Sequence, residues 1–164
     1  MKNTTDFATV VGSVSGVVKG GSTQSGDGKA DTIVVLKEEH EMTRAPDNTS
    51  SISLGNQKHG AFSIFKVRDC ASPLLIKMFT TNELITSVTI DTYQQTGDQA
   101  SNKVYTLLLE NARISAISLV PEDYTDSSGQ HVSRTLERVD IVYTKMTNTS
   151  VPGNLETAYD STAG

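Results

Sequence analysis

The run "KEEHE", residues 37 to 41, holds the residue types of a metal or acid–base site, because carboxylates and imidazole bind cations and transfer protons. In a strand, Glu39 and Glu41 face one way while Glu38 and His40 face the other, so no three of them converge. Charge runs usually face water. We therefore expect this run to be a solvated strand end.

Other reactive side chains are isolated. His59 and His131 lie in polar stretches and read as surface histidines, and no Ser lies in a G-x-S-x-G elbow. Cys70 precedes an expected helix, where we interpret it as a small packing residue. The "GDGKAD" run fits neither a calcium loop nor a phosphate-binding loop, so it reads as a linker. The sequence predicts no enzyme, no cofactor and no metal site.

The amino-acid composition limits which functions remain possible. The chain has 164 residues, of which 36% are hydrophobic, enough for one domain with a core. The formal net charge is −5 and the 14 Lys and Arg residues are scattered, which argues against nucleic acid as a partner. No apolar run reaches about 18 residues, and the N-terminus lacks the apolar core of a signal peptide. We expect a soluble protein, made in the cytoplasm and not inserted in a membrane.

The elements that would position these residues are mostly strands. Residues 6 to 18 and 31 to 43 each read as one strand, and the second begins with the apolar run from Ile33 to Leu36. Residues 44 to 60 are too rich in Asn, Ser, Gly and Pro for a core element, so they predict a protruding polar loop or hairpin. Residues 61 to 69 alternate again and predict the next strand.

The hydrophobic period then changes. Ser72 is a good N-cap, Pro73 suits the first turn, and apolar pairs such as Leu75 and Phe79 recur at i and i+4, which predicts a helix over about 72–82. Strand character returns after it. A second arm, residues 103 to 120, is long enough to bend.

A second polar loop, residues 121 to 134, is expected before the last strand. Long strands without β–α alternation favour a mainly β fold, an antiparallel β-barrel of two packed sheets with one flanking α-helix. We expect residues 1–145 to form this single domain. Residues 146–164 are polar and weakly patterned, so we expect a tail that is partly disordered or held by a neighbour.

The order of these elements resembles the haemolysin-coregulated protein (Hcp) family of type VI secretion tube proteins. In "FSIFKVRDCASPLLIKMFTTNELITSVTIDTY", a strand with Lys66 near its end and then Asp69 lead to a Ser-Pro helix start, a polar stop and a new strand. The segments "YTLLLENARISAIS" and "VDIVYT" follow in the family's order. The resemblance covers residues 61 to 145 well, whereas residues 6 to 43 match only as two strands.

This resemblance implies six subunits that close into a ring, and rings that stack into a tube with a wide channel. A contracting sheath would drive the tube out of the cell with a spike and effectors. The expected partners are therefore other copies of the chain, sheath and spike proteins, and effector cargo in the channel. The protein would be cytoplasmic when assembled and then secreted without a signal peptide.

Self-assembly would use outward side chains. Leu107, Leu108 and Leu109 are consecutive, so in a strand at least one of them faces away from the other two. The residues that we expect to take part are this outward Leu and four residues of the polar loop: Leu108, Arg44, Asn48, Asn56 and His59.

Two other functions stay open at this point. A tail tube protein of a phage or phage-like particle is not separated from a secretion tube by sequence. A monomeric β-barrel that binds a ligand or peptide is a more distant alternative, because such barrels are usually richer in aromatics than a chain with no Trp and 5% aromatic residues.

Overall fold

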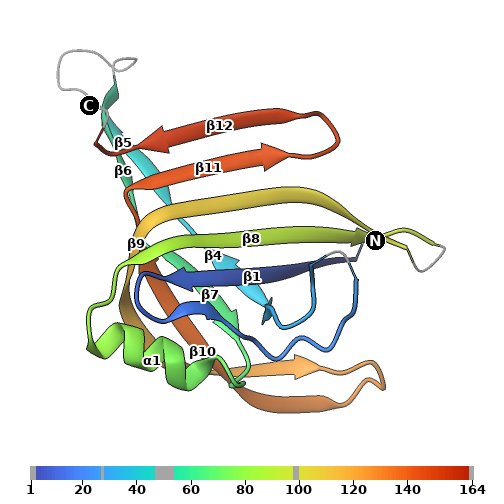
Figure 1. Ribbon diagram of the computed structural model, residues 1–164. Coiled ribbons are helices and arrows are strands. Elements are labelled where there is room, and N and C mark those ends of the chain that lie inside the picture. The colour runs from blue at the N-terminus through green and yellow to red at the C-terminus, as the bar shows by residue number, and fades with distance from the viewer. Residues whose placement is uncertain (1–2, 27, 47–53, 98–99, 163–164) are drawn as a thin grey trace.

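The computed structural model describes residues 3–26, 28–46, 54–97 and 100–162. In that part of the chain it has twelve strands and one α-helix, and every strand pair is antiparallel. The first sheet is built on three long strands (Figure 1): β1 (Thr4–Gly12), β8 (Ile85–Gln95) and the first half of β9 (Ser101–Thr125).

The strand β9 belongs to both sheets. Its residues 101–112 pair with β8, and its residues 113–125 pair with β10 (His131–Val142) in the second sheet. Asn111 lies at the junction with a φ of 50°, a left-handed backbone that Asn tolerates better than most residues. The expected bend in this arm is confirmed, and it falls at Asn111.

Two short strands, β3 (Ile33–Val35) and β4 (Lys37–Glu39), close the barrel on the other side. The strand β3 pairs with β1, whereas β4 pairs with β7 (Phe62–Lys66), which pairs in turn with β10. Between them, Leu36 N donates to Phe65 O over 2.8 Å. The pairing thus returns to β1, and the expected antiparallel barrel of two packed sheets is confirmed.

The N-terminal strands are shorter than the sequence predicts. The segment expected as one strand over residues 6 to 18 turns at Gly16, which has a φ of 68°, and continues as β2 (Gly16–Val18). The segment expected as one strand over residues 31 to 43 is three short strands, because it passes from the first sheet to the second. The last of these is β5 (Met42–Pro46).

Aliphatic side chains from both sheets fill the barrel. Leu107 and Leu109 point into this core, and Leu108 lies half-buried on the opposite face, as the alternation in a strand requires. The most deeply buried apolar side chains include Ala8, Val10, Ile33, Ile64, Ile85, Val88, Ile90, Leu109, Val139 and Ile141.

The helix α1 (Ser72–Thr80) lies outside the strands (Figure 1). Leu75 and Met78 are buried in the core, whereas Phe79 is 41% exposed. The i, i+4 pair of Leu75 and Phe79 is therefore not the packed one, because the buried helix residues Ser72, Leu75 and Met78 follow each other at i and i+3. The helix stops at Thr80, and the chain turns away at Asn82, which has a φ of 50°, while Glu83 N donates to Met78 O over 2.9 Å.

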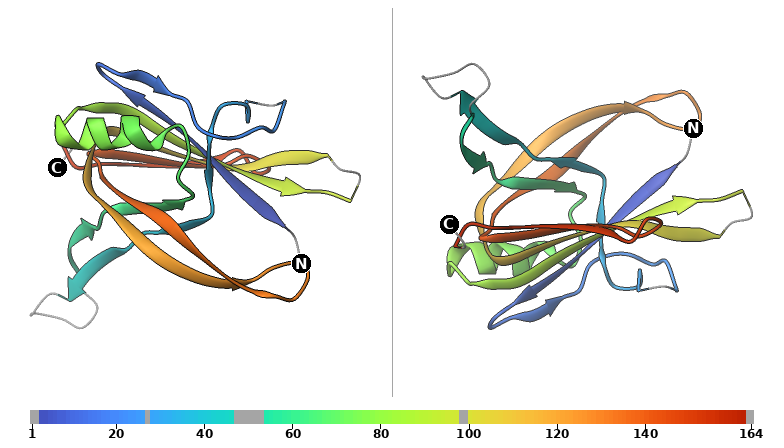
Figure 2. Two further views of the ribbon diagram at one scale, coloured as in Figure 1. Left: turned by 90° about the horizontal axis from the view of Figure 1, so that it is seen from below. Right: turned by 90° about the horizontal axis from the view of Figure 1, so that it is seen from above.

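Two hairpins leave the barrel in diverging directions (Figure 2). The first consists of β5 and β6 (Leu54–His59), within the segment expected to protrude. The second is the outer part of β9 and β10, whose strands pair up to Thr125 and His131. The expected polar loop over residues 121 to 134 is therefore wrong, because Asp126 organises a tight turn by accepting hydrogen bonds from Ser128 and Gln130.

The C-terminal segment forms a third hairpin, β11 (Lys145–Ser150) and β12 (Leu155–Asp160). The strand β11 pairs with the first half of β9, and Met146 is buried in the core. This hairpin differs from the partial disorder that the sequence predicts for the tail. Pairing with β9 satisfies the hydrogen bonds of its backbone, and the polar side chains of the segment do not signal that pairing. No helix in the described residues is long and apolar enough to cross a membrane.

Candidate assembly surfaces

A buried ion cluster fixes the helix to the barrel. Lys66 on β7 lies directly opposite Glu137 on β10, and the two residues are only 1% and 2% exposed. The Lys66 Nζ atom lies 3.3 Å from Glu137 Oε1, 2.7 Å from Asp69 Oδ1 and 2.9 Å from Ser72 Oγ. All three donors of the ammonium thus have acceptors, which a buried cation requires.

Ser72 has a different role from the one expected. The N-cap position is Ala71, and the Ser72 hydroxyl instead bonds to Lys66 and accepts from Asp69 N over 3.1 Å. The Asp69 carboxylate accepts from Ala71 N over 3.0 Å and from Gly21 N over 2.9 Å. The cluster therefore ties the helix start and the segment after β2 to the second sheet.

The base of the β5–β6 hairpin carries a second cluster. The Tyr143 hydroxyl, just after β10, lies 2.7 Å from His59 Nδ1 and 2.8 Å from His40 Nε2. The His59 ring stacks on Tyr159 of β12, with 3.6 Å between ring centroids and 10° between ring planes. His40 also packs on Phe62, at 5.3 Å between centroids. This His–Tyr cluster, His40, His59, Tyr143 and Tyr159, joins the hairpin to the C-terminal hairpin.

Burial shifts the titration of this cluster. It lowers the pKa of the His59 imidazole. Burial and then the neighbouring His59 lower the pKa of His40. Burial and then the nearby Tyr159 raise the pKa of Tyr143 to about 12. All these groups are therefore neutral at pH 7, and the hydroxyl keeps its proton.

Three of the predicted assembly residues share the β5–β6 hairpin. Arg44 is exposed on β5 in register with Gln57, and Asn56 is exposed on β6. His59 ends β6 and is half-buried in the His–Tyr cluster, so its interpretation as a surface histidine is wrong. Asn48 lies outside the described residues.

Leu108 lies apart from these residues, on the first sheet. Its register neighbours are Thr89 of β8 and Thr147 of β11, so an aliphatic side chain is set between two threonines on the outer face. The structure therefore does not bring Leu108 and the hairpin residues together into one site. Their role in assembly stays a prediction.

The first sheet ends in an edge. In the described part of the chain, β12 pairs only with β11. Five of its six residues are exposed, and Leu155 is 71% exposed. Unpaired strand edges of this kind are templates for pairing with another chain.

The remaining candidates for chemistry stay apart. In "KEEHE", Glu39 and Glu41 are exposed, as expected for a solvated strand end, while His40 is half-buried. His131 is exposed at the start of β10, as expected. Cys70 is exposed as well, so its interpretation as a packing residue is wrong. Within the described residues, no three His, Cys, Asp or Glu side chains are grouped to hold a metal ion.

Sequence reasoning missed Tyr143, Tyr159 and the partnership of His40 with His59. No local spacing signals this cluster, because its members come from four segments up to 119 residues apart. Lys66 and Asp69 were noted in the sequence, but their buried partner Glu137 was not.

The chain matches the family described as "Type VI secretion system effector, Hcp" over residues 7–149. A relative, the "Major exported protein" of Pseudomonas aeruginosa, is 32% identical over 121 residues, which is 74% of this chain and 70% of the relative.

Solved structures agree in fold. "Crystal structure of Hcp protein" superposes with a TM-score of 0.82 at 22% identity, covering 96% of this chain and 98% of that one. "Secreted protein Hcp3 from Pseudomonas aeruginosa" superposes with a TM-score of 0.71 at 25% identity, covering 96% of this chain and 98% of that one. The family match runs from β1 to β11, through both sheets and the helix, and this chain belongs to the Hcp family of type VI secretion systems.

Proposed function

We propose that this chain is the structural subunit of the inner tube of a type VI secretion system, in which six copies close into a ring and rings stack. Its barrel domain would extend past residue 145, the limit expected from the sequence, because β11 pairs with β9 and Met146 is buried in the core. The observation that carries the proposal is the end of the first sheet at β12, which among the described residues has one strand partner and has an exposed face. A second copy can continue such a sheet by backbone pairing.

Rotational symmetry explains why this contact would give rings. When one subunit's edge meets a different surface of the next, the contact is heterologous and repeats until the rotation closes. A heterologous contact that repeats along the ring axis would stack one ring on the next. The β5–β6 hairpin, which projects furthest from the core toward one side (Figure 2), is suited to reach the next ring.

The partners follow from this role. We propose that sheath and spike proteins and effector cargo contact the assembled tube, and that the tube forms in the cytoplasm and is then exported. The relative's name, "Major exported protein", and the family description support export. We propose no enzymatic activity, and the family match favours the secretion tube over a phage tail tube or a monomeric binding barrel.

The test is electron microscopy and gel filtration of the purified protein and of Leu108→Asp. We expect rings from the parent chain and monomers from L108D, because the substitution would bury an unpaired charge between subunits. The matched control is L108T, which introduces a side chain like those of its neighbours Thr89 and Thr147 without a charge and should keep the rings. Circular dichroism must show that all three chains are folded.

One result would count against the proposal, and a second would only exclude Leu108 from the interface. A parent chain that stays at its monomer mass of 17.6 kDa at every concentration would exclude rings. Rings that survive in a folded L108D would leave the tube intact but remove Leu108 from its interface.

A further inference from the structure

One hydroxyl group bridges two imidazoles at the base of the β5–β6 hairpin. Tyr143 has a single hydroxyl proton, so it donates to one ring and accepts an N–H from the other. The distances of 2.7 Å to His59 Nδ1 and 2.8 Å to His40 Nε2 are both those of good hydrogen bonds. Of the two nitrogens that face the hydroxyl, one must therefore carry a proton and the other must be bare.

The surroundings of His59 select one arrangement of these protons. The His59 Nε2 atom is buried and has no hydrogen-bond partner among the described residues. A bare nitrogen there is less costly than a buried N–H without an acceptor. We therefore place the His59 proton on Nδ1, from which it donates to Tyr143, and the Tyr143 hydroxyl donates to His40.

Protonation of His59 would break this arrangement. The added proton would go to Nε2, where the described residues offer no acceptor. The Tyr159 ring beneath the imidazole would attract a cation through its face. The new N–H, however, lies in the plane of the imidazole ring, so the stacked Tyr159 face cannot accept it.

Protonation of His40 would act on the same bridge. His40 Nε2 would become a donor, and the Tyr143 hydroxyl would keep an acceptor only if the His59 proton moved from Nδ1 to the buried Nε2, which has no acceptor among the described residues. A second imidazolium would also stand 5.9 Å from the first, measured between the centroids of the two histidine rings. His40 borders a surface hollow of about 380 Å³, so protons can reach it from solvent.

No acidic group bonds to either imidazole in the described part of the chain, and the nearby charges have other partners. Lys37 pairs with Glu39 at 2.7 Å and Lys145 with Glu110 at 3.3 Å, while the Asp160 carboxylate accepts from Thr162. The titratable or charged groups on the elements that meet here include Lys37, Glu38, Glu39, Glu41, Arg44, Lys58, Glu110, Arg138, Asp140, Lys145, Glu156 and Asp160.

Glu38 also titrates near neutrality, but in the opposite sense. Glu38 is exposed as a residue, but partial desolvation of its carboxyl group and then the nearby Asp6 raise the pKa of Glu38 to about 7. A carboxyl with a raised pKa stabilises the fold in its protonated form, and that contribution is lost as the pH rises. Acid would therefore strengthen the Glu38 environment while it weakens the His–Tyr bridge.

We propose that His40, Tyr143 and His59 form a proton-operated latch, which holds the base of the β5–β6 hairpin against the C-terminal hairpin at neutral pH and releases it in acid. The latch is a property of the single subunit and does not depend on ring formation. For each proton that the subunit takes up on release, the ratio of open to closed subunits would rise by up to about tenfold for every unit by which the pH falls.

The test uses a fluorophore on the hairpin. Asn56 is exposed, so N56C in a Cys70→Ser background places one label on β6. Lowering the pH from about 7.5 to about 4.5, across the ordinary imidazole pKa, should lower the label's anisotropy in one transition while circular dichroism stays constant. The double variant H40Q/H59Q should abolish this transition, since amides do not titrate there.

The control is H131Q, because His131 is the third histidine and lies exposed at the far end of β10. This variant should keep the transition. A transition that persists in a folded H40Q/H59Q, or that disappears in H131Q, would overturn the latch. If the double variant does not fold, Tyr143→Phe decides: its hairpin label should already be mobile at neutral pH, and a label as immobile as in the parent would also overturn the latch.

Discussion

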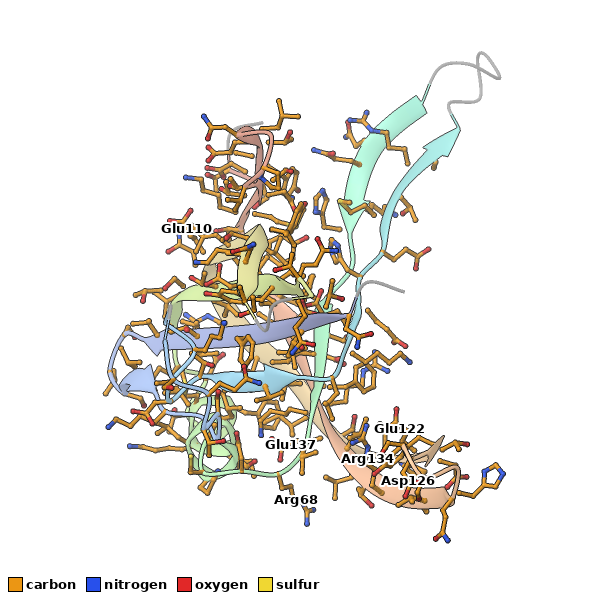
Figure 3. All side chains as sticks on the ribbon, turned by 90° about the vertical axis from the view of Figure 1, so that its right-hand side faces the viewer. Arg68, Glu110, Glu122, Asp126, Arg134 and Glu137 are labelled. Carbon is orange, nitrogen blue, oxygen red and sulfur yellow. The ribbon has the colours of Figure 1, made fainter. Side chains whose placement is uncertain are left out.

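The two hairpins that leave the barrel are attached in different ways. The β5–β6 hairpin is held at its base by neutral groups, through a hydroxyl shared between His40 and His59. The outer β9–β10 hairpin continues two barrel strands and is braced along its length by charges, with Arg134 Nε 2.6 Å from Glu122 and its guanidinium 4.3 Å from the Tyr124 ring centroid. Figure 3 shows Glu122, Arg134 and Asp126 together on this hairpin, with Glu137 nearer to the barrel.

Because of this difference, the two attachments should respond differently to the loss of one partner or to a change of protonation. Exposed ion pairs are weak and tolerate the loss of one partner, because water replaces it. A buried hydrogen-bonded cluster is all-or-none, because a lost proton or an added one leaves a polar group unpaired. We therefore infer that β9–β10 is a permanent extension of the barrel, whereas β5–β6 is attached conditionally.

The largest effect should come from the root of the β9–β10 hairpin. Lys66→Met leaves Glu137 buried without its cation, and breaking such pairs lowers the free energy of unfolding by about 3–5 kcal/mol. Urea denaturation would measure it. Lys145→Met is the control, because its pair with Glu110 is exposed and should contribute only about 0–1 kcal/mol. A K66M chain as stable as K145M would contradict this assignment, whereas K66M/E137M should regain part of the loss.

Removing the shared hydroxyl should have the next largest effect. Tyr143→Phe leaves two partly buried imidazole nitrogens without their partner, at about 1–3 kcal/mol of unfolding free energy. The same urea experiment applies. Tyr105→Phe is the matched control, because the Tyr105 hydroxyl donates to Asn148 on an exposed face and water can replace it. Equal losses in the two variants would show that the His–Tyr cluster adds nothing to stability.

The charged brace on β9–β10 should matter less. We expect Arg134→Ala to lower the unfolding free energy by about 0–1 kcal/mol, since the pair with Glu122 is about one-third exposed on each side. High salt should reduce this loss of unfolding free energy further, because salt screens exposed ion pairs. A loss well above that range would mean that Arg134 anchors the hairpin, and the contrast between the two hairpins would fail.

The smallest effect is expected from acid at the tip of β9–β10. Hydrogen bonds from Ser128 and Gln130 lower the pKa of Asp126, so this carboxylate stabilises its turn at high pH and loses that role only as the pH falls through its lowered value. His40 and His59 have lowered pKa values, so their stabilising contribution to the latch is lost as the pH falls below about 6.5, the ordinary pKa of an imidazole. A label at S127C should therefore keep its anisotropy at pH values that free a label at N56C.

Local signals in the sequence predicted part of this fold. Pro73 after a polar residue, and Asn82 before a β-branched run, set the helix limits to within two residues. Three consecutive leucines correctly predicted that Leu108 faces away from Leu107 and Leu109. These succeed because capping, left-handed turns and strand alternation depend on a few neighbouring residues.

Long-range pairing was not predictable in the same way. The segment around Asp126 reads as a loop because Pro, Gly and Ser are abundant, yet the twisted ribbon needs only one organised turn. The tail reads as disordered because its partner β9 lies about 40 residues away. No regular spacing in the sequence signals the cluster of His40, His59 and Tyr143, because its members come together from three separate strand ends.

The length of β9 has a mechanical consequence. Its 25 residues would span about 80 Å when extended, and one covalent chain runs from the first sheet through Asn111 into the second. A pull along this strand loads the hydrogen bonds to β8, β10 and β11 together in shear, whereas a pull across it would open them one at a time. The subunit is therefore stiff along β9 and weak across it, and the direction in which an assembly drives it decides how much force it withstands.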